Sequence, residues 1–213
     1  MSASLLTLAD SRLPAGGHTH SGGVEQAIAA GVVTDPTSLA AFLRRRLATS
    51  GAVAAGLAAA ACGADADRLA ELDAEADART PSPALRTASR QQGRGLVRVG
   101  RRAWPSPTWD ALPALPHHPI ALGVAAAAGG LTPRDAAQAA AYLSISGPAT
   151  AAQRLLAMDP LTVAAVTARL APEIDAVTSR SYGQDCGLPA ATDPLLDLLA
   201  EVHAARKDRF FAS

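Results

Sequence analysis

Apolar residues along this chain recur every three or four positions, in segments of which five begin with a capping residue followed by proline. After Asp35-Pro36, for example, Leu39, Phe42 and Leu43 fall on one side of a helix. Proline at the first helical position, after a residue whose side chain accepts backbone hydrogen bonds, is typical of a helix N-terminus. Convincing strand-like alternation of apolar and polar residues is missing, and no internal repeat stands out. The pattern therefore predicts an all-α fold with no sheet. The starts of this kind are Asp35-Pro36, Ser82-Pro83, Thr132-Pro133, Asp159-Pro160 and Asp193-Pro194.

Prolines, glycines and caps divide the chain into roughly eight to ten expected helices, which we place in a single-domain bundle over residues 1–213. The helix after Asp35 is expected to bend or break at Ser50-Gly51. The helix after Thr132 is expected to bend or break before Pro148, which cannot donate to the helical ladder. The last helix carries Leu195, Leu198, Leu199 and Val202 along one face. Other expected segments are a helix capped by Ser21 and ended by Gly31, an alanine-rich run over 52–61, an acidic helix over 65–79, a connector over 104–119, a hydrophobic helix over 119–128, a boundary near Pro172 and a loop over 183–192.

The composition supports the helical prediction and gives the chain no strong net charge. Hydrophobic residues make up 49% of the 213, but aromatic residues only 3%, and much of the apolar content is alanine. Alanine has the highest helix propensity and is depleted in strands. The 19 basic and 19 acidic side chains cancel, which gives no electrostatic reason to expect nucleic acid or an anionic membrane as a partner.

The cysteines and the start of the chain indicate a soluble cytoplasmic protein. Cys62 and Cys186 lie far apart in the sequence and lack metal-ligand spacing, which suits a reduced compartment. The first residues lack the basic start and long apolar stretch of a signal peptide. The longest small-apolar run, residues 120–128, is too short to span a bilayer. We therefore expect neither secretion nor a membrane segment.

The most distinctive stretch of the chain is residues 5–28. Two glycine pairs, Gly16-Gly17 and Gly22-Gly23, enclose His18 and His20. Glycine-rich loops at helix N-termini often bind anions, but no Gly-Lys-Ser/Thr sequence ends this one, so it is not a P-loop. Two histidines without a third ligand do not make a metal site. The favoured interpretation is a pair of hydrogen-bonded loop histidines, and a nickel-binding pair remains the alternative.

Arginine recurs every four positions along the predicted helix that follows Ser82, and this spacing places neighbouring arginines on one helix face. A solvated basic face and a docking strip for an acidic protein surface explain the row equally well. Nucleic acid is a weaker interpretation, because the chain is neutral and no aromatic residues are interleaved with the arginines. The row consists of Arg86, Arg90, Arg94, Arg98 and Arg102.

The last eight residues, from Arg206 to Ser213, mix charged side chains with Phe210 and Phe211. Two adjacent aromatic residues in such a segment need either the protein core or a partner to cover them. Exposed aromatic anchors surrounded by cations are typical of protein-binding hot spots. We expect this segment to dock a partner, with burial against the core as the alternative.

Three of these stretches resemble the UreF family of urease accessory proteins. Residues 5–25 follow its N-terminal signature, LLxLxDSxLPxGGFxHSxGLE, and residues 89–94 are similar to its SRQxGR run. The last helix and C-terminus resemble RHExxYxRLFRS, in which Ala204, Lys207 and Ala212 depart from the pattern. Residues 156–161 also depart, because the family has a PLGQTxGQ-like turn there. The matching residues are Leu5, Leu6, Leu8, Asp10, Ser11, Leu13, Pro14, Gly16, Gly17, His20, Ser21, Gly23 and Glu25 at the start, and His203, Arg209, Phe211 and Ser213 at the end.

The resemblance implies an all-α, non-catalytic scaffold that joins the accessory protein UreD (also called UreH) to the GTPase UreG for nickel insertion into apo-urease. It further implies two copies in a symmetric complex, and no catalytic residue, cofactor or metal ligand in this chain. Combined with the charge patterns, it gives a set of residues expected to meet partners. These are Arg12, His20, Glu25, Arg90, Arg94, His203, Arg206, Lys207, Arg209, Phe210 and Phe211.

The residues by themselves lead only to a helical binding protein without an active site. The sequence holds no serine elbow, no His-Glu-x-x-His motif and no nucleotide fingerprint. Three alternatives stay open: a nickel metallochaperone that uses His18, His20 and a third ligand, a small helical enzyme, and a divergent UreF-like protein with a regulatory role.

Overall fold

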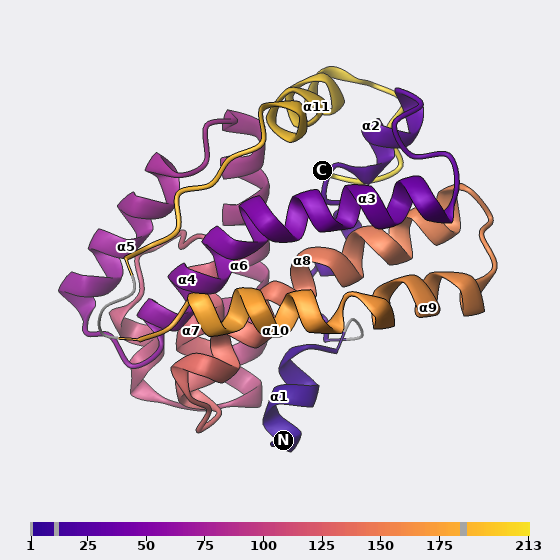
Figure 1. Ribbon diagram of the computed structural model, residues 1–213. Coiled ribbons are helices and arrows are strands. Elements are labelled where there is room, and N and C mark those ends of the chain that lie inside the picture. The colour runs from indigo at the N-terminus through magenta and orange to yellow at the C-terminus, as the bar shows by residue number, and fades with distance from the viewer. Residues whose placement is uncertain (1, 11–12, 184–186) are drawn as a thin grey trace.

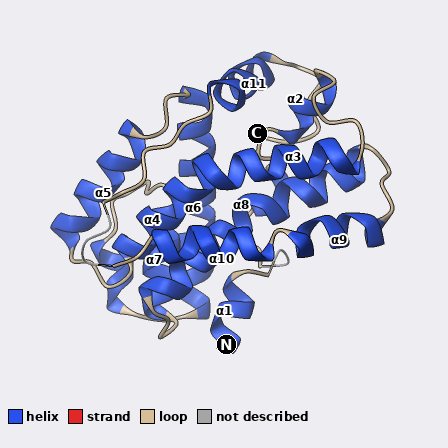
Figure 2. Cartoon of the chain, in the orientation of Figure 1, coloured by secondary structure: helices blue, strands red, loops and turns tan. Residues whose placement is uncertain are grey.

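The proline-led helix starts predicted from the sequence are all present in the structure. In each, proline occupies the first turn and the capping side chain accepts backbone N–H bonds, as Asp35 does from Thr37 and Ser38. The computed structural model describes residues 2–10, 13–183 and 187–213. Within these ranges it contains helices and no strand, which confirms the all-α prediction (Figure 1, Figure 2).

Most of the helices follow the predicted boundaries. A π-helical turn, η2 (Leu47–Gly51), joins α3 to α4, so the predicted disturbance at Ser50-Gly51 is a widened turn in a continuous helix. No helix in the described ranges is both long and apolar enough to cross a bilayer. The elements are α1 (Ala3–Leu8), η1 (Gly17–Thr19), α2 (Val24–Ala29), α3 (Pro36–Arg46), η2 (Leu47–Gly51), α4 (Ala52–Ala61), α5 (Ala66–Ala78), α6 (Pro83–Ala103), η3 (Pro107–Ala111), α7 (His118–Ala128), α8 (Pro133–Leu155), α9 (Pro160–Arg169), α10 (Ala171–Arg180) and α11 (Pro194–Ala205).

The long helix α8 lies at the centre of the bundle. It packs against α3, α4, α7 and α10, and α7 in turn contacts α4 and α6 (Figure 1). The buried side chains of α8 are mostly alanines. Small residues let the helices approach until no side chain fits between them. A Cβ atom on Gly123 of α7, for example, would lie only 2.5 Å from the Ala58 carbonyl oxygen of α4. The backbones of neighbouring helices therefore occupy much of the core volume that bulky side chains occupy in other proteins.

Helix α8 runs through Pro148 without a break, whereas the helix was expected from the sequence to bend or break before this residue. Proline lacks the N–H that would bind the Ser144 carbonyl oxygen one turn earlier, so that oxygen needs another donor. Arg46, the last residue of α3, supplies it through Nε at 2.7 Å, while its Nη1 donates to the Gly22 carbonyl oxygen at 2.8 Å. The helix stays continuous because a side chain from another helix satisfies the freed carbonyl.

Helix α11 buries a face that is one residue out of register with the predicted one. Its buried residues are Leu196, Leu199, Ala200 and His203. Leu198 and Val202, which were predicted on the same face as Leu199, are instead 64% and 52% exposed. The prediction counted only apolar residues, but His203 lies inside because it bonds the Glu25 carboxylate of α2. This polar contact belongs to the surface by which α11 packs on α2 and α6.

The start of α2 also differs from the expectation. Its N-cap is Gly23, with φ at 86°, instead of Ser21. The Ser21 hydroxyl accepts only a long bond from the Glu25 N–H, at 3.5 Å. Glycine is favoured at this position because residues with a Cβ atom rarely adopt the left-handed backbone that turns the chain into α2. Gly31, with φ at 70°, follows the end of the helix as predicted.

We expect Gly123→Ala to lower the free energy of unfolding by about 2 kcal/mol, because the added methyl group overpacks the contact between α4 and α7. A Cβ atom there would meet the Ala58 oxygen at 2.5 Å and the Ala61 Cβ atom at 2.7 Å. The matched control is Gly147→Ala within α8, where a Cβ atom meets nothing within 4 Å. That variant should change the free energy of unfolding by less than about 1 kcal/mol, because the gain in helix propensity is offset by the preference of a residue before proline for extended backbone. Urea unfolding measures both, and equal effects would contradict the packing argument.

Candidate partner-binding site

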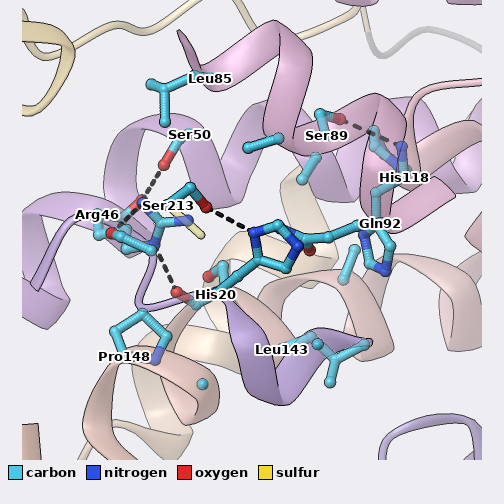
Figure 3. A pocket seen from close by; sticks show the side chains of 18 of the residues that line it. His20, Arg46, Ser50, Leu85, Ser89, Gln92, His118, Leu143, Pro148 and Ser213 are labelled. Atoms are coloured by element: carbon cyan, nitrogen blue, oxygen red, sulfur yellow. Dashed lines mark hydrogen bonds between the residues drawn. The ribbon is translucent and has the colours of Figure 1, made fainter. Parts of the chain in front are cut away.

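The C-terminal segment (residues 206–213) lies against the glycine loop (residues 16–23) that precedes α2, so two stretches far apart in the sequence form one surface. The C-terminus accordingly lies beside α2 (Figure 1). The Ala212 N–H donates to the Thr19 carbonyl oxygen at 2.7 Å, and the Ser21 N–H donates to the Ser213 carbonyl oxygen. The Ser213 hydroxyl and the His20 Nδ1 atom lie 2.7 Å apart in a third bond (Figure 3). Sequence reasoning singled out each end separately and missed this contact between them.

The carboxylate of Glu25 is the anchor of the C-terminal segment. Its Oε1 atom accepts the Phe210 N–H at 2.8 Å, and its Oε2 atom accepts the Phe211 N–H at 3.0 Å. The His203 Nε2 atom lies 2.8 Å from the same Oε2 atom. Glu25 and His203 are only 4% and 2% exposed. Burial raises the pKa of Glu25, but the bonds from Phe210, His203 and Phe211 outweigh burial and leave the pKa below its usual range. The charge is therefore retained inside the protein because every donor around it is already in place.

The two adjacent phenylalanines have different environments. Phe211 packs against the hydrophobic core, whereas Phe210 is 86% exposed. Burial against the core therefore holds for Phe211, and partner docking stays a prediction for Phe210. Around them, Arg206 donates to the Gln26 Oε1 atom at 3.1 Å, and Lys207 and Arg209 are exposed. The segment consequently presents one apolar side chain, two cations and the carboxylate of Asp208 to solvent, and Asp208 pairs with Arg206.

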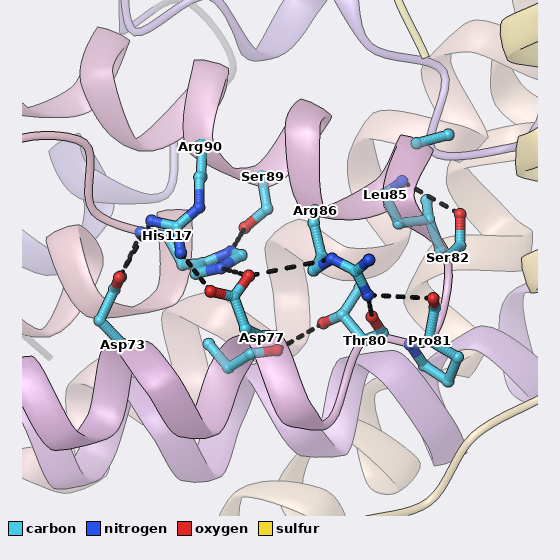
Figure 4. Close-up of polar contacts among 12 residues, drawn as sticks. Asp73, Asp77, Thr80, Pro81, Ser82, Leu85, Arg86, Ser89, Arg90 and His117 are labelled. Atoms are coloured by element: carbon cyan, nitrogen blue, oxygen red, sulfur yellow. Dashed lines mark hydrogen bonds and ion pairs between the residues drawn. The ribbon is translucent and has the colours of Figure 1, made fainter.

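The arginine row on α6 is divided by the fold. Arg90 bonds the Asp73 carboxylate at 2.9 Å and the Asp77 carboxylate at 2.5 Å, both on α5 (Figure 4). Arg86 donates to the Thr80 carbonyl oxygen at 2.7 Å. Arg94 is exposed, and it makes no ion pair within the part of the chain that the structure describes. Only the later part of the row is therefore free to meet another molecule.

His117 completes a polar network that sequence reasoning missed. Its Nε2 atom lies 2.9 Å from the Asp77 carboxylate, its Nδ1 atom lies 3.0 Å from the Ser89 hydroxyl, and its backbone N–H donates to Asp73 at 2.8 Å (Figure 4). Burial lowers the pKa of His117 more than the bond to Asp77 raises it. The network ties α5 and α6 to the start of α7. Its sequence signal is the pair of aspartates four residues apart, matched by two arginines with the same spacing.

A cavity of about 390 Å³ lies beside the contact between the glycine loop and the C-terminal segment. Its wall includes His20, Arg46, His118 and Ser213 (Figure 3). Burial, together with the neighbouring His20, lowers the pKa of His118 to about 4. Burial also lowers the pKa of His20. Both imidazoles are therefore neutral at pH 7.

The structure places His20 and His18 in different settings. His20 is buried and bonds Ser213, whereas His18 is exposed. Among residues 2–10, 13–183 and 187–213, no group of three or more His, Cys, Asp or Glu side chains is arranged to hold a metal ion. Arg12, one of the predicted partner-binding residues, lies outside the described residues.

The fold and the site together define a class, an alanine-packed helical protein whose C-terminal segment and glycine loop build a charged surface around one exposed phenylalanine. The chain belongs to the UreF family: the UreF family model matches residues 33–171. It is 53% identical to the urease accessory protein UreF of Mycolicibacterium vanbaalenii over 213 residues, which cover 99% of this chain and 98% of the relative. The same identity and coverage hold for the urease accessory protein UreF of Mycobacterium marinum. The protein of that name from Mycobacterium tuberculosis H37Rv is 47% identical over 211 residues, with 99% and 98% coverage.

These matches confirm the resemblance predicted from the sequence. The family model covers the middle of the chain, where fewest residues carried that resemblance, and the relatives align with nearly the whole length. The relatives are named accessory proteins, and a role in urease maturation follows for the family to which this chain belongs.

We expect Glu25→Gln to lower the free energy of unfolding by about 3 kcal/mol, because a neutral amide cannot accept from both backbone N–H groups and His203 together. The amides of Phe210 and Phe211 should also lose protection from hydrogen exchange. The matched control is Glu173→Gln, since Glu173 makes only an exposed ion pair with Arg44. That change should cost less than about 1 kcal/mol. An equal loss of unfolding free energy in the two variants would show that the Glu25 carboxylate does not anchor the C-terminal segment.

We also expect stability to fall with acidification well before the carboxylates titrate. His118 has a pKa of about 4 in the folded chain and 6.5 as its ordinary value, so the unfolded chain binds more protons between these values. The free energy of unfolding should therefore drop by about 2 kcal/mol from His118 alone between pH 6.5 and pH 5. Urea unfolding across this range should show a shallower slope for His118→Asn than for the original chain. An unchanged slope in His118→Asn would contradict this assignment.

Proposed function

We propose that this protein is a non-catalytic scaffold in urease maturation, which joins a UreD-type (UreH-type) accessory protein to the GTPase UreG while nickel enters apo-urease. It acts in the cytoplasm, as two copies within the complex. The observation that carries this proposal is the C-terminal segment, which Glu25 holds in place while Phe210 remains 86% exposed. Family membership supports the setting in urease maturation.

The C-terminal segment has the properties of a protein-docking element. Its backbone is fixed by bonds to Glu25, Thr19 and Ser21, so little conformational entropy is lost when a partner binds. Phe210 offers an apolar anchor, and Lys207 and Arg209 offer exposed charge around it. Leu198 and Val202 of α11 add exposed apolar surface in the helix that precedes the segment. We assign this region to the UreD-type partner.

The glycine loop is better explained as a support for this segment than as a nucleotide site. The Ser21 N–H is occupied by the Ser213 carbonyl oxygen, and the N–H groups of Thr19 and His20 bond carbonyl oxygens within the loop. Backbone donors that are already paired are unavailable to a phosphate. The loop also lacks the lysine that contacts phosphates in a P-loop. In this proposal, the nucleotide chemistry belongs to UreG.

We expect Phe210→Ala to weaken binding to a purified UreD-type partner about thirtyfold, which corresponds to about 2 kcal/mol for one lost anchor. The fold should be unaffected, because Phe210 is 86% exposed. The control is Leu161→Ala on α9, where Leu161 is 79% exposed and far from α11 in the bundle (Figure 1). Calorimetric titration of each folded variant gives the affinity. Equal affinities for the original chain and Phe210→Ala would remove the docking role.

A further inference from the structure

One enclosed cation of this protein lacks a carboxylate partner. Among the described residues, the other arginines that are partly buried pair with aspartate or glutamate, as Arg90 does with Asp73 and Arg206 with Asp208. Arg46 instead bonds only two neutral acceptors, the carbonyl oxygens of Ser144 and Gly22. Burial lowers the pKa of Arg46 to about 10, so the guanidinium remains charged at pH 7. An enclosed charge without a counter-charge is costly, and an anion would offset that cost.

The guanidinium of Arg46 keeps unused donors. It has five N–H groups, of which one on Nε and one on Nη1 are used by the two carbonyl oxygens. Its Nη2 atom makes no hydrogen bond within the described residues. The two carbonyls fix the plane of the group, so the direction of the remaining donors is set before any ligand arrives.

Arg46 lines the cavity of about 390 Å³ described above. This volume is in the range of small-molecule sites. His20, His118 and Gln92 add neutral polar groups to the wall, while Leu85 and Leu143 line it with apolar surface (Figure 3).

The other charged groups on this wall do not neutralise Arg46. Asp193 pairs with Arg45 at 2.8 Å, and Arg79 pairs with Glu75. Asp10 and Asp197 also line the cavity, and neither makes an ion pair with Arg46. Arg154 completes the set of charged lining residues and is exposed.

We propose that this cavity is a binding site for a small organic monocarboxylate. Its carboxylate would take the free donors of Arg46, and its apolar chain would lie along Leu85 and Leu143. A guanidinium pairs with a carboxylate in a two-bond geometry, and a single enclosed cation matches a single negative charge. The apolar part of the wall favours an organic acid over an inorganic anion. Because Phe211 and Ser213 also line the cavity, the ligand would contact the C-terminal segment.

The test is calorimetric titration of the full chain with hexanoate at pH 7. We expect saturable binding with one site per chain, and at least tenfold weaker binding of hexan-1-ol, which has the same chain without the charge. Arg46→Gln should weaken hexanoate binding at least tenfold, and Arg46→Lys should restore part of the affinity. The matched control is Arg44→Gln, at an exposed arginine of the same helix that pairs with Glu173, because neither residue lines the cavity and this variant should bind hexanoate normally.

Because Arg46 also supports α8, the glutamine variant could fail to fold, and a second variant keeps the proposal testable. Leu143→Trp adds bulk to the opposite wall and leaves Arg46 in place, and it should reduce hexanoate binding at least tenfold. Several results would overturn the proposal: no saturable hexanoate binding up to about 10 mM, equal affinity for hexan-1-ol, or unchanged affinity in a folded Arg46→Gln or Leu143→Trp chain. Inorganic phosphate or chloride that binds as tightly as hexanoate would replace the organic acid with a simple anion and also overturn it.

Discussion

The placement of the C-terminal segment depends on one buried carboxylate. Glu25 accepts bonds from the Phe210 and Phe211 backbones and from His203. A buried charge is stable only when it is fully hydrogen-bonded, so its donors must assemble around it. This requirement orients α11, brings the segment onto the glycine loop and leaves Phe210 outside. It also explains the two terminal sequence patterns, because residues of one pattern bond residues of the other, as Glu25 bonds His203 and His20 bonds Ser213.

A second constraint operates in the core. Alanine and glycine bring α4, α7 and α8 together closely, and Pro148 frees one carbonyl inside this packed region. Arg46 satisfies that carbonyl from the end of α3, which places an arginine where an aliphatic side chain would be expected. The same residue thus stabilises the central helix and supplies the cation of the neighbouring cavity. Its two roles follow from one geometry, since the carbonyls use only part of the guanidinium.

Local sequence signals predicted the helix starts and the all-α fold, because a cap and a proline act within one turn. The sequence could not show that α8 stays continuous at Pro148, since the compensating donor, Arg46, lies about a hundred residues earlier. The buried face predicted for α11 was one residue out of register with the observed face, because the prediction used apolar residues alone and His203 is polar. The sequence also could not show which arginines of the row are paired, since Arg90 meets Asp73 and Asp77 of α5 only in the folded chain. In each case the outcome depends on a polar contact between residues far apart in the sequence, which the periodicity of apolar residues does not reveal.

In the proposed function, Glu25 acts on partner binding through the C-terminal segment that it holds, without touching the partner. The most direct test is the affinity of folded Glu25→Gln for a purified UreD-type partner, measured beside a chain that carries Glu25→Gln and Phe210→Ala together. We expect Glu25→Gln alone to weaken binding at least tenfold, although Glu25 is only 4% exposed. Adding Phe210→Ala to this variant should weaken binding much less than Phe210→Ala does in the original chain. Full affinity in Glu25→Gln, or fully additive losses, would contradict this role of Glu25.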